Sequence, residues 1–360
     1  MKKLLAFVML LCLSFASTVS ATEYNALKTE SLSVAQCEEL KKEGISEKEI
    51  STMKRQIEIN NLSSVQIGNY ISSKINAARL LKEEGYEPQN YLKTTNGDTV
   101  TPMGIVPQVK HGNPLSVING RSSDSTVYDV SDVINSIDQT GVYYLVESKA
   151  GYDQMTSYLT LPVVQNVASI DRPFHMFGVS STNGSANMWG DIGLVYFPSS
   201  GTWKGFYNFK EANESIHNEN YEFSFSGGRN LYFHLTITTS SAILDIINPS
   251  SWSVIRTVRY DFATNCVPSN FSTVKISKQI TLAQHYVDSL NVNTGTRMTG
   301  GQFSQTHLYL TNEYDYAFAP AYCNRAIRQG PTESAYRKVT YTRTAWTSDN
   351  VNISFNWGEV

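Results

Sequence analysis

Apolar side chains follow two different periods along this 360-residue chain. Over residues 31–91 they recur every three or four positions, as at Ile50, Met53 and Ile57, which is the spacing of one face of a helix. From residue 127 onward they alternate with polar residues at every second position, which is the spacing of a strand with one buried face. The pattern predicts a helical segment followed by a larger β domain.

Three serines mark the starts of the predicted helices. Each is followed three positions later by Gln or Glu and then by an apolar stripe: Ser33 with Gln36, Ser46 with Glu49, and Ser63 with Gln66. In such a capping box the two side chains satisfy backbone N–H groups that the first helical turn leaves without partners. Residues 22–92 are therefore predicted to form a small region of three helices, which acts either as a structural cap or as an interaction module or pro-region.

The segment 93–126 follows neither period. Pro102, Pro107 and Pro114 lie there among glycines, serines and threonines, and proline has no backbone N–H to donate within a helix or a sheet. We interpret this segment as a linker or an extended covering strand.

About a dozen short runs of Val, Ile, Tyr, Phe and Thr fill residues 127–360, and the clearest alternations are 231–237 and 351–357. No helical pattern separates these runs, and parallel pairing needs long crossover connections, so the strands are predicted to pair antiparallel. One polar and one apolar face per strand favours two stacked sheets. The number of strands suits a large jelly roll better than an immunoglobulin-type module. The predicted fold is mainly β, an antiparallel two-sheet jelly-roll sandwich of the concanavalin A-like kind.

Residues 1–21 have the features of a cleaved secretory signal peptide. Lys2 and Lys3 precede an apolar stretch from Leu4 to Phe15, and small residues follow up to Ala21. About twelve apolar residues are too few to cross a bilayer core of about 30 Å, and no later stretch is long enough to do so. The protein is therefore predicted to be secreted and to have no membrane span.

Export would place Cys37, Cys266 and Cys323 in an oxidising compartment, where disulfides form. None of them belongs to a Cys-x-x-Cys motif, so metal knuckles and thioredoxin-type redox sites are excluded. The simplest hypothesis is a disulfide between Cys266 and Cys323, which both lie in the β domain. Three reduced, buried thiols are the alternative.

The charge balance limits the class of partner. Lys and Arg number 29 against 32 Asp and Glu, a formal net charge of −3, so the chain lacks the basic field with which a general nucleic-acid binder displaces counterions. An apolar content of 41% with so little net charge also excludes a disordered chain. No nucleic-acid partner is expected, and the oligomeric state stays open.

The segment Asp191-Ile-Gly-Leu-Val-Tyr196, followed by Pro198, Trp203 and Phe206, resembles a strand–turn–strand element of secreted bacterial β-sandwich proteins. It is most similar to the YrpD-like family. The resemblance covers only this short stretch of the chain. It implies a concanavalin A-like fold and an extracellular location, and it carries no activity over to this protein.

Familiar catalytic patterns are absent from the sequence. Glu-x-Asp-x-Glu on one strand, Gly-x-Ser-x-Gly and His-Glu-x-x-His do not occur, which removes the usual signatures of concanavalin-like glucanases, serine hydrolases and zinc proteases. No catalytic residue is assigned and no cofactor is expected. Calcium bound by loop carboxylates, around Glu313 and Asp315 or at Asp171, stays open.

Aromatic residues supply the remaining candidate site. Strand alternation puts Trp189 and Asp191 on one face of their run, and Trp203 and Tyr207 on one face of the next run. If the two runs form a hairpin, rings and a carboxylate gather on one sheet surface, which suits the C–H face and the hydroxyls of a sugar. The alternative for each tryptophan is a place in the core.

The main hypothesis is therefore a non-enzymatic protein that binds an extracellular or cell-wall glycan through these four residues. One alternative is a glycan-degrading hydrolase or lyase of the same fold. The other is an extracellular protein-interaction or surface protein.

Overall fold

The computed structural model describes residues 31–83, 99–101, 104–106, 130–135, 140–211, 217–285, 287–310 and 315–356. By internal contacts the chain divides into two compact units, Met1–Ile71 and Ser72–Val360. The predicted signal peptide lies outside the described residues, and so does most of the predicted linker.

The predicted helices are present as α2 (Val34–Lys42), α3 (Glu47–Ile59) and α4 (Ser64–Glu83). Ser33 and Ser46 each form a complete capping box. Before α4, the Ser63 N–H donates to Gln66 Oε1 at 3.0 Å, and the Gln66 N–H donates to Ser63 Oγ at 3.4 Å. None of the described helices is long and apolar enough to cross a membrane.

Strands make up most of the remaining described chain, with one 3₁₀ turn and one short helix. Their bounds are β1 (Thr99–Thr101), β2 (Gly104–Val106), β3 (Ser131–Ile134), β4 (Gly141–Ser148), β5 (Gln154–Thr160), β6 (Val163–Gln165), β7 (Asp171–Asn183), β8 (Ala186–Phe197), β9 (Thr202–Glu211), β10 (His217–Phe225), β11 (Asn230–Ile237), β12 (Ser241–Asn248), β13 (Ser253–Asp261), β14 (Lys275–Gln284), β15 (Arg297–Tyr309), β16 (Asp315–Ala317), η1 (Pro320–Tyr322), β17 (Cys323–Gly330), α5 (Glu333–Tyr336), β18 (Val339–Ala345) and β19 (Ser348–Ser354).

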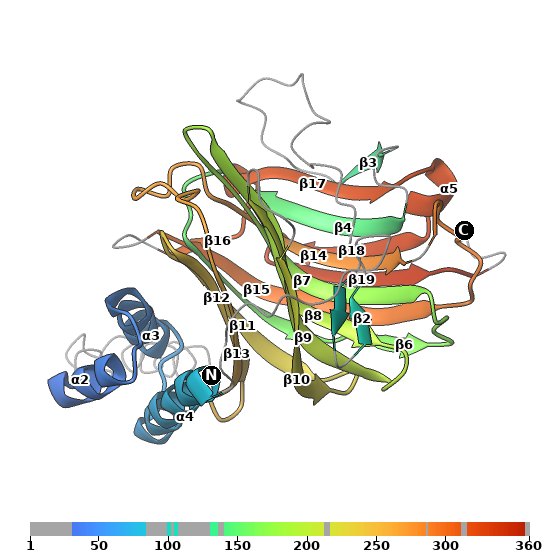
Figure 1. The fold of residues 1–360 in the computed structure, drawn as a ribbon. Coiled ribbons are helices and arrows are strands. Elements are labelled where there is room, and N and C mark those ends of the chain that lie inside the picture. The colour runs from blue at the N-terminus through green and yellow to red at the C-terminus, as the bar shows by residue number, and fades with distance from the viewer. Residues whose placement is uncertain are drawn as a thin grey trace, which may run out of the picture. The chain divides into compact units, whose positions relative to one another are not determined.

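Two sheets are layered into a sandwich (Figure 1). The eight-stranded sheet has the order β10-β9-β8-β7-β14-β4-β17-β3, and the nine-stranded sheet has the order β13-β12-β11-β5-β15-β19-β18, with β6 and β16 also paired to β15. Among the described pairs of the two sheets, β3 with β17 is parallel and the others are antiparallel. The predicted mainly β, two-sheet jelly-roll fold with preceding helices is confirmed.

Two interior strands were not predicted, β5 and β17. On β5 the side chains of Gln154, Thr156 and Ser157 are buried, and the hydroxyls of Ser157 and Thr306 share a hydrogen bond of 2.9 Å. Polar groups that pair with each other inside the protein interrupt the apolar alternation on which strand prediction depends. The strand is therefore visible only once its partners are known.

The main hydrophobic core lies between the two sheets. Ile192 and Leu194 of β8 point into it, and Phe209 of β9 stacks on Tyr260 of β13 with ring centroids 4.6 Å apart and an interplanar angle of 7°. Because these contacts join one sheet to the other, each strand of the eight-stranded sheet has an inner face toward this core and an outer face directed away from it.

The predicted Cys266–Cys323 disulfide is not formed. Both cysteines, and Cys37, are free and buried, which was the alternative. Cys266 lies near Glu211 and Thr264, whereas Cys323 lies near Lys278 and Arg343. The two thiols thus occupy different environments, and a shared location in the β half of the chain was not sufficient evidence for a bond.

Candidate functional site

A shallow pocket, open to solvent and with a cavity volume of about 50 Å³, lies on the outer face of the eight-stranded sheet. Five strands contribute to it: β4, β7, β8, β14 and β17. On β14, Ser277 and Gln279 line the pocket while Ile276 and Ile280 enter the core. The alternation along one strand therefore separates the pocket from the core.

Strand register arranges one row of pocket residues across the sheet. Arg325 lies opposite Glu147, Glu147 opposite Ser277, Ser277 opposite Gly178, and Gly178 opposite Asp191. Directly opposed residues on one face of a sheet are close enough for their side chains to interact. The row thus brings a guanidinium, two carboxyl groups and a hydroxyl onto one surface.

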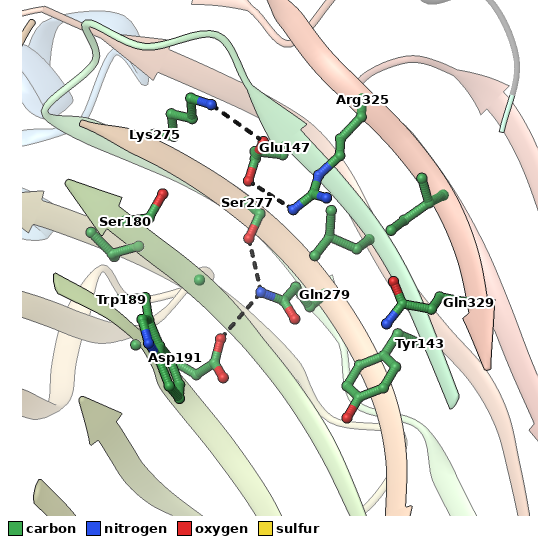
Figure 2. Close-up of a pocket in the computed structure, with 15 residues that line it drawn as sticks. Tyr143, Glu147, Ser180, Trp189, Asp191, Lys275, Ser277, Gln279, Arg325 and Gln329 are labelled. Atoms are coloured by element: carbon green, nitrogen blue, oxygen red, sulfur yellow. Dashed lines mark hydrogen bonds and ion pairs between the residues drawn. The ribbon is translucent and has the colours of Figure 1, made fainter. Parts of the chain in front are cut away.

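Gln279 connects the middle of this row to Asp191. Its Nε2 donates to Asp191 Oδ1 at 3.1 Å and to Ser277 Oγ at 2.9 Å, and all three side chains are buried (Figure 2). A buried carboxyl group that accepts a hydrogen bond from a fixed amide has a defined orientation. Asp191 is therefore held in place on the floor of the pocket.

Gly178 provides the space for this arrangement. A Cβ at this position would lie 2.1 Å from Gln279 Nε2, 2.4 Å from Ser277 Oγ and 3.1 Å from Asp191 Oδ1. The hydrogen bonds of Gln279 pass over strand β7 at Gly178. Glycine permits them because it has no side chain to fill this space.

At the other end of the row, cations surround Glu147. Arg325 Nη2 lies 3.2 Å from its Oε2, Lys275 Nζ lies 4.0 Å from its Oε1, and Asn324 Nδ2 donates to Oε1 at 2.5 Å. Figure 2 shows Arg325 and Lys275 meeting Glu147 on the far side of Ser277 from Asp191. The charge of Glu147 is thus balanced within the protein.

Trp189 forms one wall of the pocket. It lies two residues from Asp191 on β8, so both side chains point to the outer face, and its ring is half-buried. Figure 2 shows the ring beside the Asp191 carboxyl group. The sequence-based proposal of a shared face for Trp189 and Asp191 agrees with this placement.

Trp203 and Tyr207 lie elsewhere. The expected hairpin of β8 and β9 is formed, but Ile192 pairs with Tyr207 and Tyr196 with Trp203, so both aromatic residues point inward. Trp203 has no exposed surface, and its Nε1–H donates to the Pro162 carbonyl at 3.2 Å. We correct the prediction of one four-residue surface: the register puts these two rings in the core.

The sequence pattern does not identify four of the pocket residues: Glu147, Ser277, Gln279 and Arg325. A weak signal was present on β14, where Ser277 and Gln279 interrupt an otherwise apolar run at alternate positions. That alternation indicates a polar face but does not indicate which strands border it.

The described residues contain no group of three or more His, Cys, Asp and Glu side chains placed to hold a metal ion. Asp171, one of the two calcium candidates, accepts hydrogen bonds from Gln284 at 2.7 Å and from Thr294 and Thr296 at 2.5 Å each. Burial raises the pKa of this carboxyl group. Of the other calcium candidate, Glu313 and the side chain of Asp315 lie outside the described part of the chain.

Comparison with known proteins gives no family. No family model matches the chain, and no curated protein matches it. Among solved structures, scytalido-glutamic peptidase with a peptide-based transition-state analogue has 10% identity and a TM-score of 0.38 over 59% of this chain and 98% of the peptidase chain. A Bacteroides ovatus glycoside hydrolase family 16 endo-glucanase has 12% identity and a TM-score of 0.24 over 41% of this chain and 69% of its own. The galectin LEC-6 of Caenorhabditis elegans has 11% identity and a TM-score of 0.23 over 40% of this chain and 90% of its own. At these values none of the three indicates an activity for this chain.

Proposed function

We propose that the outer-face pocket binds a sugar residue of an extracellular or cell-wall glycan, and that the protein is a secreted, non-enzymatic binder. The observation that carries the proposal is the half-exposed ring of Trp189 beside the fixed Asp191–Gln279–Ser277 set. A flat ring offers a surface for the C–H face of a sugar, and the neighbouring oxygen and nitrogen atoms accept and donate hydrogen bonds to its hydroxyls.

The arrangement also reduces the cost of binding. Asp191 and Gln279 are already oriented by their mutual hydrogen bond, so a ligand does not have to immobilise them. The predicted signal peptide and the resemblance to the YrpD-like family support an extracellular location, where such glycans occur.

Binding is favoured over hydrolysis by the surroundings of the two carboxyl groups. Two strands, β14 and β7, separate Glu147 on β4 from Asp191 on β8, and Asp191 accepts a hydrogen bond from Gln279. Arg325 also neutralises Glu147, which does not suit a proton donor.

The test is binding of the purified protein to insoluble cell wall and to a glycan array, with a reducing-end assay on every glycan that binds. Trp189→Ala is expected to weaken binding at least about tenfold, roughly 1.4 kcal/mol. Tyr158→Ala is the matched control, because Tyr158 is a half-buried aromatic residue on β5 of the other sheet. Blank arrays at high protein concentration, or equal binding by Trp189→Ala, would overturn the proposal. Release of new reducing ends would replace it with a hydrolase.

A further inference from the structure

Lys278 and Asp349 form a buried pair between the two sheets. Lys278 is on β14 of the eight-stranded sheet and Asp349 is on β19 of the nine-stranded sheet. Lys278 Nζ lies 2.5 Å from Asp349 Oδ2, and neither side chain has any exposed surface. An ammonium and a carboxylate buried in this way each lose several kcal/mol of hydration.

The two oxygens of Asp349 have different partners. Oδ1 accepts a hydrogen bond from the Tyr144 hydroxyl at 2.6 Å and another from Arg343 Nε at 2.8 Å. Arg343 Nη2 in turn donates to the Tyr144 oxygen at 2.8 Å. Oδ2 receives no well-directed hydrogen bond from the part of the chain that the structure describes. One oxygen is thus held by two donors, and the other faces the lysine.

Lys278 Nζ also lies near one carbonyl group, the Cys323 thiol and two aromatic rings. Nζ donates to the Trp346 carbonyl at 3.1 Å and lies 5.9 Å and 5.3 Å from the ring centroids of Phe303 and Phe318. Burial lowers the pKa of Lys278, which favours the neutral, nucleophilic amine. Lys278 therefore lies close to the carboxyl group, out of contact with solvent, where burial favours the loss of its proton.

We propose that Lys278 and Asp349 condense to form an intramolecular isopeptide bond that joins the two sheets. Starting from the ion pair, Lys278 Nζ passes one proton to Asp349 Oδ2, and the neutral amine then forms a bond to Asp349 Cγ and gives up a second proton. The Cγ–Oδ2 bond breaks, and Oδ2 takes both protons and leaves as water. No atom changes oxidation state, and no further reactant is needed.

The partners of Oδ1 stabilise this step. Attack on Cγ moves negative charge onto Oδ1, where Tyr144 and Arg343 already donate hydrogen bonds. The product replaces two buried charges with a neutral amide, which removes the cost of keeping both ions in the interior. The bond would link strands of different sheets covalently.

A second buried pair supplies an internal control. Lys74 Nζ lies 2.7 Å from both Asp245 Oδ1 and Asp245 Oδ2. The ammonium there contacts both oxygens, and Thr257 Oγ1 also donates to Oδ1 at 2.6 Å, so the lysine does not face a single oxygen as it does at Asp349. This pair is expected to remain ionic.

The test is protease digestion of the denatured full chain followed by tandem mass spectrometry. We expect one branched peptide joining Lys278 to Asp349, lighter than its two linear components by one water molecule, while the peptides with Lys74 and Asp245 stay linear. Full recovery of linear peptides carrying unmodified Lys278 and Asp349 would overturn the proposal, and it would leave the glycan-binding proposal untouched.

Two variants make the test specific. In Lys278→Arg the branched peptide must disappear, because the guanidinium does not condense; a branched peptide that persists would show that another residue is linked and would refute the assignment. In Asp349→Asn the same branch is expected to form with loss of ammonia in place of water. Because the wild-type digest decides the question, neither variant has to fold for the proposal to be refuted.

Discussion

Two consecutive residues of β14 show how differently the two faces of the eight-stranded sheet use polar side chains. Lys278 points to the inner face and meets Asp349, Arg343 and Tyr144, while Gln279 points to the outer face and meets Asp191. Lys278 and Asp349 have no exposed surface, so the polar groups of the inner cluster have to satisfy each other. Asp191, Ser277 and Gln279 are also buried, but they lie on the floor of an open pocket, where a ligand can reach them.

Substitutions on the two faces of the eight-stranded sheet are expected to change different properties of the protein. A buried charge that loses its partner has nothing to replace it, whereas a pocket side chain that loses its partner is solvated by water. Substitutions on the inner face should therefore change the free energy of unfolding, and substitutions on the outer face should change ligand affinity. The predictions below test this division, beginning with the largest effect.

Asp349→Ala is expected to cost about 3 to 5 kcal/mol of unfolding free energy. It prevents the bond to Lys278, and it leaves the buried amine of Lys278 and the guanidinium of Arg343 without the Asp349 oxygens. Urea unfolding at neutral pH measures the loss. The control is Asp132→Ala, which removes the half-exposed ion pair with Arg328 and should cost no more than about 1 kcal/mol. Similar losses for the two variants would contradict the contrast between closed and open clusters.

Acid should have the next largest effect on stability. His175 is fully buried, its ring lies 4.4 Å from that of Phe303, and burial lowers its pKa to about 3. Burial, with Arg172 nearby, likewise lowers the pKa of His285 to about 4. The unfolded chain binds these protons at about pH 6.5 and the folded chain does not, so stability is complete above that pH and falls as the pH drops from 6.5 toward 4.

At pH 5 the loss is about 2 kcal/mol for each histidine relative to pH 7. Urea unfolding across this range measures it. In His175→Phe, the number of protons taken up on unfolding should fall by about one, so the unfolding free energy should depend less steeply on pH. An unchanged dependence would show that His175 does not stay neutral in the folded protein.

Gly178→Ala should have the smallest effect on stability and a clear effect on the pocket. The Cβ of the new alanine would displace both Gln279 Nε2 and Ser277 Oγ and so break the hydrogen bond from Gln279 to Asp191. We expect about tenfold weaker glycan binding, roughly 1.4 kcal/mol, with an unfolding free energy within about 1 kcal/mol of the wild type. Gly68→Ala on α4, where a Cβ meets nothing within 4 Å, is the control that should change neither binding nor the pocket.

Much of the fold could be predicted because its signals are local. The capping serines begin the helices where expected, and the apolar alternations of residues 231–237 and 351–357 correspond to β11 and β19, with Trp357 outside the described residues. Strand β5 could not be predicted, because its buried polar residues find partners on other strands.

The candidate site was predictable only in part. Trp189 and Asp191 share a face because they are two residues apart on one strand, and this holds in any register. Whether Tyr207 lies on the same face depends on how β9 pairs with β8. A shift of the register by one residue would move Tyr207 to the other face of the sheet. The same limit applies to the cysteines, whose positions in the chain do not indicate their distance in space.

The sequence by itself determined the helical and β parts, the approximate strands and the two faces of each strand, because backbone geometry sets those periods residue by residue. Only the tertiary structure decided which strands are neighbours. It aligned Glu147, Ser277, Gly178 and Asp191 in one row, and it brought Lys278 against Asp349 from the opposite sheet. Such contacts join residues far apart in the chain, and they follow from the pairing and packing of whole sheets, which no local spacing of residues specifies.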